Sequence, residues 1–200
     1  MRRESVKGEV LYVGGIDVSY RGKLGIGVFV IMKYPTAEPL GCSYVAKEAC
    51  VPYVPGLLAF REMEVAAPLV GAVLRSHRID LLFVNGHGIA HPRRFGLATH
   101  VGLVFKTRTI GVARRRLVGT EVREGNRILL THEGETVGAR LGSFYVSPGW
   151  GVTLEEALEY TSTLTRKGLP EPLRLADRLG KALGAEAGNG GDCAWLMREL

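Results

Sequence analysis

Three oxygen-bearing side chains stand where an unpaired polar group is costly or where ligands commonly bind. Asp17 lies in a predicted strand whose apolar residues face the other way, and Glu62 lies on the apolar stripe of a predicted helix, which we expect to be buried. Asn85 directly follows the apolar run 79–84, at the carboxyl end of a predicted strand, where ligands bind in open α/β sheets. Because a buried carboxylate needs a cation or a strong hydrogen-bond donor, these positions indicate a site for Mg²⁺, which prefers oxygen ligands and accepts phosphate oxygens.

The pattern alone leaves a purely structural interpretation open. In that interpretation Asp17 is a polar residue at a strand edge, Glu62 forms a salt bridge and Asn85 begins an Asn-Gly turn. Both interpretations agree with the residue types, since buried carboxylates also occur in structural ion-pair networks.

Residues 85–94 (NGHGIAHPRR) form the most informative segment of the chain. The segment does not match G-x-G-x-x-G, so it is not a dinucleotide-binding fingerprint. Gly86 and Gly88 allow the backbone to approach a ligand closely. His87 and His100 are interpreted as structural histidines.

Basic residues cluster next to this glycine-rich segment. His91 stands close to Arg93 and Arg94, and we expect it to contact a phosphate or a water on the metal. A second basic run occupies residues 114–116. Such clusters beside glycine-rich turns are typical of a track for the phosphates of a nucleic acid.

Charge and hydropathy narrow the class of protein. The net charge of +6 and the isoelectric point near 9.4 suit a polyanionic partner. No apolar run reaches the roughly 20 residues of a membrane helix, and residues 1–7 are charged and lack the apolar core of a signal peptide. We therefore expect a cytoplasmic protein that has no membrane partner.

The cysteines predict neither a metal centre nor a cross-link. The sequence contains Cys42, Cys50 and Cys193, an odd number without a C-x-x-C pair. This scatter argues against a zinc site and against a disulfide framework.

The order of the predicted elements indicates one α/β domain over residues 1–200. An antiparallel meander opens the chain, and a helix then leads to a strand that pairs in parallel. A capping box begins at Thr153, and the tail 184–200 is expected to be partly flexible. The predicted strands are 10–20, 25–32, 40–48, 79–84, 109–113 and short strands within 121–146, with Gly134 in a turn; the predicted helices are 57–76, with a kink or restart at Pro68, 97–105, 154–168 and 172–183.

Several blocks, in this order, resemble the endonuclease V family over residues 10–177. They are 15–17 (GID), 52–62 (PYVPGLLAFRE), 86–94, 109–113 (TIGVA), 147–149 (SPG) and 170–172 (PEP). The second block is long and specific. The resemblance implies a ribonuclease H-like fold, in which helices flank a mixed sheet with an antiparallel opening meander.

The resemblance also implies roles for individual residues. The metal ligands would be Asp17, Glu62 and the residue at position 85, with His91 and Arg114 as further catalytic residues. The pocket for a flipped hypoxanthine would be lined by Gly56, Leu58, Gly86, Leu97 and Gly111. A wedge inserted into the duplex would consist of Pro52, Tyr53, Val54 and Pro55, and phosphate contacts would come from Arg93, Arg94 and Arg115.

The implied activity is hydrolysis of the second phosphodiester 3′ to deoxyinosine in DNA, with Mg²⁺ as cofactor and Mn²⁺ as a substitute. The cation would activate the attacking water and stabilise charge on the phosphate oxygens. An RNA-directed nuclease and a non-catalytic module that binds inosine or distorted nucleic acid remain alternatives. The sequence shows no reader of the 2′-hydroxyl group.

Three departures from the family pattern concern catalytic strength. The family has Asp where this chain has Asn85, so one negative charge is missing from the metal site. Arg114 replaces the usual Lys, and Trp150 and Thr153 replace a His and an Asp. Three origins for Asn85 remain open: an engineered change, a natural change in a weaker enzyme, or an Asn-Gly step at which deamidation restores a carboxylate.

Overall fold

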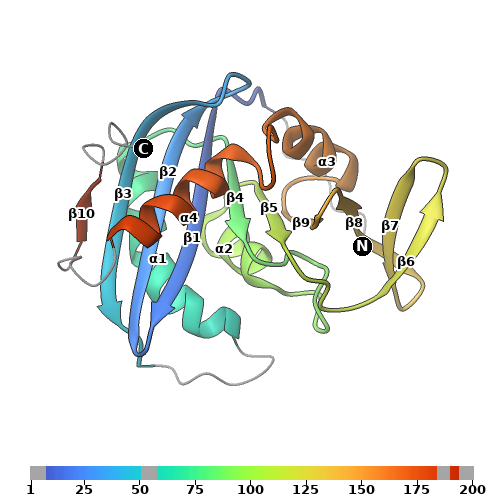
Figure 1. The fold of residues 1–200 in the computed structure, drawn as a ribbon, viewed down its shortest axis with the longest axis horizontal. Coiled ribbons are helices and arrows are strands. Elements are labelled where there is room, and N and C mark those ends of the chain that lie inside the picture. Colours follow the sequence, from blue (N-terminus) through green and yellow to red (C-terminus); the bar gives the residue numbers. More distant parts are fainter. Residues whose placement is uncertain (1–7, 51–57, 184–189, 194–200) are drawn as a thin grey trace.

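The computed structural model describes residues 8–50, 58–183 and 190–193. Its strands form a single mixed sheet in the order β10-β3-β2-β1-β4-β5-β9-β8-β7-β6 (Figure 1). The strands are β1 (Tyr12–Arg21), β2 (Leu24–Lys33), β3 (Glu38–Glu48), β4 (Leu81–Asn85), β5 (Thr109–Ala113), β6 (Thr120–Glu124), β7 (Arg127–His132), β8 (Glu135–Leu141), β9 (Phe144–Trp150) and β10 (Gly190–Asp192). The helices are α1 (Leu58–Ser76), α2 (Leu97–Phe105), α3 (Leu154–Thr163) and α4 (Glu171–Leu183).

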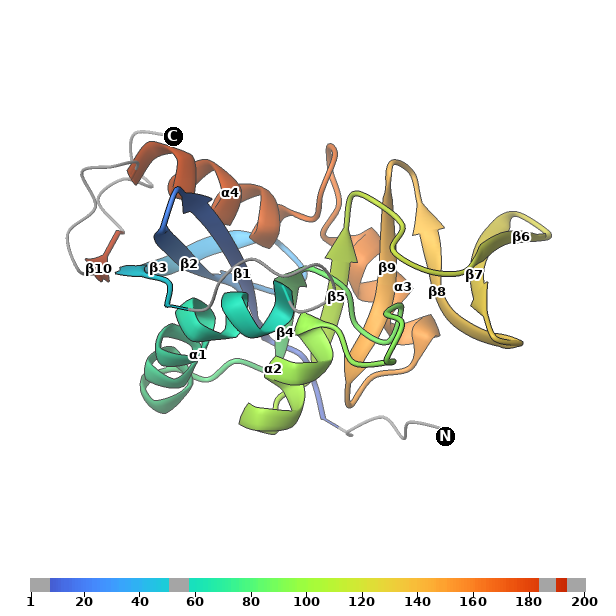
Figure 2. The same cartoon turned by 90° about the horizontal axis from the view of Figure 1, so that it is seen from below.

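Helices cover both faces of the sheet and create two cores. Figure 2 shows α4 on one side of β1 and β2, and α1 and α2 on the other. Alternate residues of each central strand point to opposite faces, so Leu81 and Phe83 join the core beneath α3 and α4, whereas Leu82 and Val84 join the core beneath α1 and α2. This double burial explains the continuous apolar runs of the central strands.

The pairing of the first strands confirms the predicted topology. β1 pairs antiparallel with β2, and β2 pairs antiparallel with β3. β4 returns through α1 and pairs in parallel with β1, and β5 extends the parallel set beside β4. The carboxyl ends of β4 and β5 therefore lie together at one edge of the sheet, beside the middle of β1, which continues to Arg21.

The helices follow the predicted signals, with two differences at their bounds. Thr153 and Glu156 form the expected capping box at the start of α3. α3 ends at Thr163 and not near Gly168, because the chain turns at Leu164, whose side chain is fully buried in the core. α1 continues through Pro68 as one helix, without a restart. None of the helices in the described part of the chain is long and apolar enough to cross a membrane.

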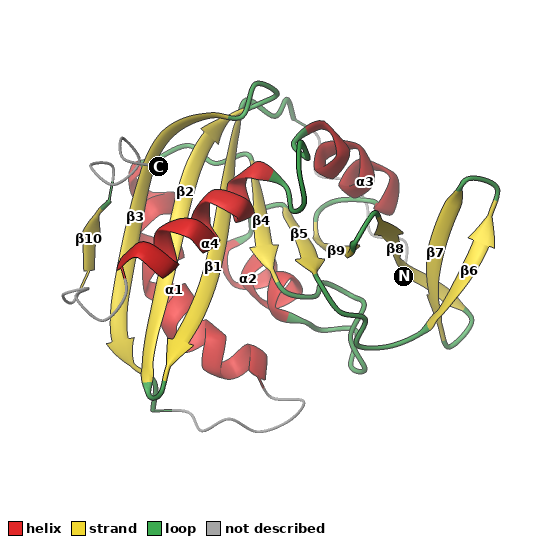
Figure 3. Ribbon diagram, in the orientation of Figure 1, coloured by secondary structure: helices red, strands yellow, loops and turns green. Residues whose placement is uncertain are grey.

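The strands after β5 form a ladder of hairpins that widens the sheet. Gly134 lies in the turn between β7 and β8, as predicted, and has a φ of 77°. The outermost hairpin, β6–β7, projects beyond the helices (Figure 3). The cleft between this ladder and α3 has mixed charge, since both Arg127 and Glu155 line it.

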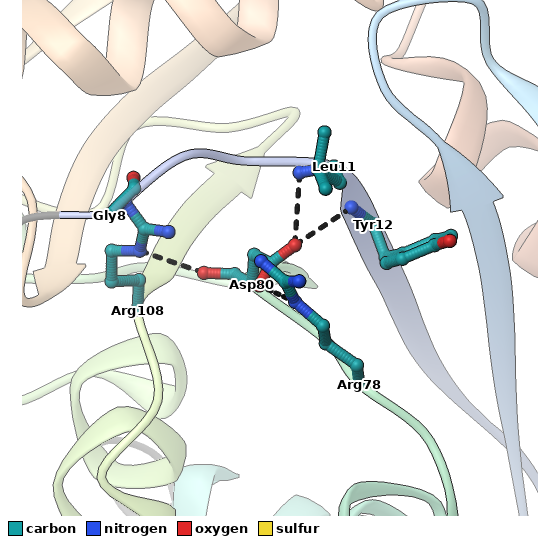
Figure 4. Close-up of polar contacts among 6 residues, drawn as sticks. All are labelled: Gly8, Leu11, Tyr12, Arg78, Asp80 and Arg108. Carbon is teal, nitrogen blue, oxygen red and sulfur yellow. Dashed lines mark hydrogen bonds and ion pairs between the residues drawn. The ribbon is translucent and has the colours of Figure 1, made fainter.

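A partly buried carboxylate, that of Asp80, fixes the first strand at the end of the sheet opposite the carboxyl ends of β4 and β5. Oδ2 of Asp80 accepts hydrogen bonds from the backbone N–H groups of Leu11 and Tyr12, at 2.9 and 3.0 Å, and Oδ1 accepts one from Nε of Arg78 at 2.7 Å (Figure 4). Arg108 donates through Nε to the carbonyl oxygen of Asp80 at 2.8 Å. These contacts tie the start of β1 to the loop before β4.

The structure differs from the prediction for the cysteines. A disulfide joins Cys42 of β3 to Cys193, and β10 pairs antiparallel with β3 beside it. The prediction of no disulfide was wrong, because residues 151 positions apart become neighbours only through the tertiary fold. Part of the predicted flexible tail is therefore a strand at the sheet edge, and residues 184–189 and 194–200 lie outside the described residues.

Candidate metal and nucleic-acid site

The parallel register brings Asp17 and Asn85 together. Ile16 of β1 aligns with Val84 of β4, so the residues that follow them are neighbours, Asn85 at the carboxyl end of β4 and Asp17 in the middle of β1. The side-chain amide of Asn85 donates a hydrogen bond to Oδ1 of Asp17. The N–H of the next residue, Gly86, donates to the carbonyl oxygen of Val112 at 2.9 Å, and this bond opposes the backbone attack that deamidation of Asn85 requires.

Glu62 faces the same centre from the first turns of α1. The residue as a whole is only partly buried, which differs from the fully buried position that the helical stripe predicted. Its carboxyl group is nevertheless desolvated, and this burial, with repulsion from Asp17, raises the pKa of Glu62 to about 8. Asp17 of β1 and Glu62 of α1 are thus close enough for the charge of one to affect the ionisation of the other.

Asp17 is itself 6% exposed. Burial raises its pKa above the ordinary value, the hydrogen bond from Asn85 lowers it, and the charge of Asp177 raises it further. The net pKa is raised. The surroundings of Asp17 therefore disfavour its ionised form, and a bound cation would stabilise that form.

Asp177 is an acidic neighbour of the site that the sequence analysis missed. It lies on α4, which packs against β1, and its carboxylate forms an ion pair with Lys181 at 2.7 Å. The signal that could have revealed it is its position directly after Ala176, at the border of the buried stripe of α4. The i, i+4 pairing with Lys181 is typical of a solvated helix face, and it concealed this position.

Contacts around Tyr20 place the start of α1 against β1. The hydroxyl of Tyr20 donates to the carbonyl oxygen of Arg61 at 2.8 Å, and the Arg61 guanidinium lies 4.2 Å from the centre of the Tyr20 ring. Arg61 also donates to the carbonyl oxygen of Gly22 at 3.2 Å. Since Glu62 is the next residue, these contacts orient it toward the carboxyl end of β1.

A cavity of about 270 Å³ lies beside the acidic residues. This volume is just below the range of about 300–1,000 Å³ that is usual for drug-sized ligands, and it suits a single base. Three of the predicted pocket residues, Leu58, Gly86 and Leu97, line the cavity. Its other lining residues are Ala59, Glu62, His87, His91, Gly96 and Leu117.

Gly111 lies beneath the loop that forms the cavity wall. A Cβ at Gly111 would stand 2.3 Å from the backbone nitrogen of Gly88, and one at Gly88 would stand 2.0 Å from the carbonyl oxygen of Pro148. The glycines therefore allow three backbone segments to pack directly against one another. Gly111 supports the cavity wall and is not among the residues that line the cavity.

Two histidines belong to the cavity. His91 is 9% exposed, and its Nδ1 accepts a hydrogen bond from the backbone nitrogen of Arg93 at 3.2 Å. His87 also lines the cavity, although its pattern predicted a merely structural role. Burial lowers the pKa of His87 to about 4, and the neighbouring charge of His91 contributes to this shift, so the ring is neutral at neutral pH.

Only some of the residues predicted to contact phosphates are exposed. Arg93, Arg114 and Arg115 are exposed. Arg94 is held by the β7–β8 turn, since it donates to the carbonyl oxygen of His132 at 2.6 Å and lies 3.5 Å from the Glu135 carboxylate. Arg94 therefore connects the glycine-rich loop to the hairpins. The predicted wedge and Gly56 lie outside the described residues.

The departures at Trp150 and Thr153 lie away from the acidic residues. Trp150 aligns with Thr109, at the end of β5 opposite to Arg114. Thr153 caps α3. Neither side chain is at the carboxyl end of the parallel strands.

The donor set fits a hard divalent cation. Within residues 8–50, 58–183 and 190–193, no three His, Cys, Asp or Glu side chains already meet closely enough to form a metal site. The carboxylates of Asp17 and Glu62 repel each other, and Asn85, whose amide NH2 group hydrogen-bonds to Asp17, carries an amide oxygen as a third ligand atom. Mg²⁺ commonly binds one or two carboxylates and keeps waters in its other positions.

Comparisons with known proteins identify similar sequences and structures. The sequence model of the Endonuclease V family matches residues 1–178. Endonuclease V of Aeropyrum pernix is 45% identical over 177 residues, which cover 84% of this chain and 69% of that protein. Endonuclease V of Streptomyces avermitilis superposes with a TM-score of 0.83 at 30% identity, over 93% of this chain and 86% of that one.

A third similar structure contains nucleic acid. Endonuclease V of Ciona intestinalis, in complex with a 24mer DNA containing an inosine followed by a ribo-adenosine, superposes with a TM-score of 0.77 at 27% identity, over 87% of this chain and 86% of that one. The family resemblance and the ribonuclease H-like fold that the sequence implied are confirmed.

Proposed function

Because the chain belongs to the endonuclease V family, we propose that it is a metal-dependent endonuclease that cleaves DNA containing deoxyinosine. The bond hydrolysed is the second phosphodiester 3′ to the deaminated base. The observation that carries this proposal is the meeting of Asp17, Asn85 and Glu62 beside a cavity that suits one base.

In this proposal the acidic residues hold the cation. Asp17 and Glu62 supply carboxylate oxygens, Asn85 supplies its amide oxygen, and Asp177 reinforces the negative field from α4. Mg²⁺ bound there would neutralise charge on the scissile phosphate and lower the pKa of the attacking water. Mn²⁺, which also prefers oxygen ligands, is expected to substitute.

The basic and histidine residues position the phosphate. His91 lines the same cavity as Glu62, so it is proposed to contact the phosphate that follows the extruded base. Arg93, Arg114 and Arg115 are exposed and free to neutralise neighbouring phosphates. Arg114 extends from the end of β5, at the same sheet edge as Asn85.

The cavity accounts for base selection in this proposal. A base inside a duplex cannot reach these residues, so it must first be extruded from the stack. Leu58 and Leu97 offer apolar contacts to the ring, and the glycine loop 86–88 brings backbone groups close to its polar edge. The segment 52–55 is proposed to fill the gap that the extruded base leaves in the duplex.

Asn85 is proposed to weaken activity without abolishing binding. An amide keeps one oxygen ligand but adds no negative charge, so the cation is held less tightly. Its N–H group also neutralises part of the charge of Asp17 through their hydrogen bond, in competition with the metal. The protein is therefore expected to bind inosine-containing DNA and to nick it slowly.

The test is a nicking assay on a labelled duplex with one deoxyinosine, in Mg²⁺ or Mn²⁺. The Asn85→Asp variant is expected to nick at least about ten-fold faster than the unsubstituted chain, because it restores a carboxylate ligand. Asn126→Asp makes the same chemical change in the exposed β6–β7 turn and is expected to leave the rate unchanged. Glu62→Gln in the Asn85→Asp background is expected to abolish nicking.

Selective binding without nicking by Asn85→Asp would contradict the nuclease proposal and support a non-catalytic binding module. Binding that ignores inosine would contradict both. The same assay is repeated with a single ribonucleotide 3′ to inosine. The nicking rates of the two duplexes show whether a deoxyribonucleotide or a ribonucleotide is preferred at that position.

A further inference from the structure

A cluster of aromatic rings stands at the adjoining ends of α1 and α2. Phe60 is a large apolar residue, yet it is 50% exposed. Its ring contacts that of His100, with ring centres 5.6 Å apart and planes at 72°. Phe95 supports His100 from another direction, with ring centres 5.2 Å apart. We call Phe60, Phe95 and His100 the aromatic platform.

The aromatic platform adjoins the base-sized cavity from both helices. On α1, Phe60 directly follows Ala59, which lines the cavity. In the second segment, Phe95 directly precedes Gly96 and Leu97, which line it as well. A strand that places one base in the cavity must therefore pass close to the platform with a neighbouring nucleotide.

The ring geometry leaves an aromatic surface available to a ligand. Because Phe60 and His100 are nearly perpendicular, at least one face of the Phe60 ring is not covered by His100. Burial lowers the pKa of His100, so its ring is uncharged at neutral pH and packs against Phe60 as an aromatic group. A braced ring loses little conformational freedom when a ligand binds to it.

We propose that Phe60, braced by His100 and Phe95, is a stacking site for a nucleobase adjacent to the extruded one. The inference rests on the proposed function and adds a second base contact to it. Exposed aromatic rings stack on bases of any sequence, and such contacts are typical of proteins that bind unpaired nucleotides. The base next to an extruded nucleotide has lost a stacking partner, and Phe60 would replace that partner.

Charge favours a nucleic acid over a protein as the occupant of the platform. Exposed Arg93 stands two residues before Phe95, and the chain carries a net charge of +6. The apolar exposure does continue along α2 to Leu103, which is 43% exposed and three residues after His100. A protein partner would contact Leu103 as well as the platform, whereas a stacked base would contact the platform alone. Substitution of Leu103 therefore distinguishes a protein from a nucleic acid as the ligand.

The experiment measures binding to a duplex with one deoxyinosine and 2-aminopurine at each flanking position in turn, without Mg²⁺ so that the strand stays intact. Phe60→Ala is expected to weaken binding about ten-fold and to remove the quenching of 2-aminopurine at one flanking position. Phe60→Trp is expected to retain both. Phe60→Leu keeps the apolar volume without an aromatic face, and it is expected to behave like Phe60→Ala.

Leu103→Ala is the matched control, an exposed apolar residue of α2 whose loss is expected to leave binding and quenching unchanged. If the unsubstituted chain selects inosine but Phe60→Ala binds equally well, the stacking site is wrong and the proposed function stands. Full binding by Phe60→Leu, or an equal loss in Leu103→Ala, would likewise overturn it. If the unsubstituted chain does not select inosine, the proposed function itself fails.

Discussion

The hydrogen bond between Asn85 and Asp17 reduces the charge repulsion within the acidic site. A carboxylate at position 85 would add a third negative charge beside Asp17 and Glu62, where burial and the charge of Asp17 already raise the pKa of Glu62 to about 8. The amide instead donates a hydrogen bond to Oδ1 of Asp17. The contact that reduces this repulsion therefore also reduces the demand for a cation.

Gly111 provides a test of the cavity wall at the scale of one residue. In Gly111→Ala the new Cβ would stand 2.3 Å from the backbone nitrogen of Gly88, and neither backbone segment can move away without disturbing the sheet. We expect the variant to lose about 1–3 kcal/mol of unfolding free energy and most of its selectivity for inosine. Urea denaturation and binding to matched duplexes with and without inosine measure the two effects.

Gly41→Ala is the control for Gly111→Ala, since a Cβ at Gly41 meets no atom within 4 Å. Selectivity that remains unchanged in Gly111→Ala would show that the loop 86–88 does not shape the base pocket.

At the scale of single residues, the sequence predicted some of the contacts around the site and missed others. The proximity of Asp17 and Asn85 follows from the parallel pairing of β1 and β4, so the pattern was sufficient to predict it. Asp177 was missed because an i, i+4 ion pair with Lys181 looks like a solvated surface. Arg94 was predicted to contact phosphate, but its partners, such as His132, lie in a hairpin whose position only the tertiary fold determines.

At the scale of elements, the end of the sheet opposite the acidic site depends on Asp80. Burial alone would raise the pKa of Asp80, but hydrogen bonds from Arg78 and from the backbone of Leu11 and Tyr12 outweigh burial and lower it. A lowered pKa in the folded state means that the ionised carboxylate stabilises the fold. This stabilisation is present above the pKa of the unfolded chain, about 3.9, and is lost as the pH falls through the folded-state pKa.

We therefore expect Asp80→Ala to lower the unfolding free energy by about 1–3 kcal/mol at pH 7. The difference from the unsubstituted chain should shrink as the pH falls below about 4, where Asp80 becomes protonated. Denaturant titrations at several pH values measure this trend. Glu38→Ala, which removes an exposed carboxylate, is the control, and a difference that does not depend on pH would contradict the assignment.

Element types were predictable because their periodicities are unambiguous, whereas some ends were not. α2 and β5 have the predicted bounds, since each is an apolar segment between clear turns. The end of α3 was misplaced because Gly168, which has a φ of 74°, looks like a helix terminator. The helix in fact ends earlier, where Leu164 turns into the core.

At the scale of the whole molecule, the Cys42–Cys193 disulfide joins the last strand to the third across 151 residues of sequence. No local pattern contains such a contact, which is why the sequence analysis excluded it. A cross-link that closes a long loop reduces the entropy of the unfolded chain. We expect Cys193→Ser to lower the unfolding free energy by about 2–4 kcal/mol.

Thermal denaturation of Cys193→Ser with and without a reductant measures this contribution. The reductant should lower the melting temperature of the unsubstituted chain to that of the variant and should not affect the variant further. Cys50→Ser changes an exposed free cysteine and is expected to have no effect. An unsubstituted chain whose melting temperature ignores the reductant would show that the cross-link adds no stability.

The most direct test of the account is a titration of the protein with Mn²⁺ in the absence of nucleic acid. Electron paramagnetic resonance counts the ions that are bound. We predict one ion per chain, bound about ten-fold or more tightly in Asn85→Asp than in the unsubstituted chain, and lost from both when Asp17→Asn or Glu62→Gln is added. Glu159→Gln, on the exposed face of α3, should bind as the unsubstituted chain does. Binding that survives the loss of Asp17 and Glu62, or no binding even in Asn85→Asp, would contradict a single cation held between the middle of β1 and the carboxyl end of β4.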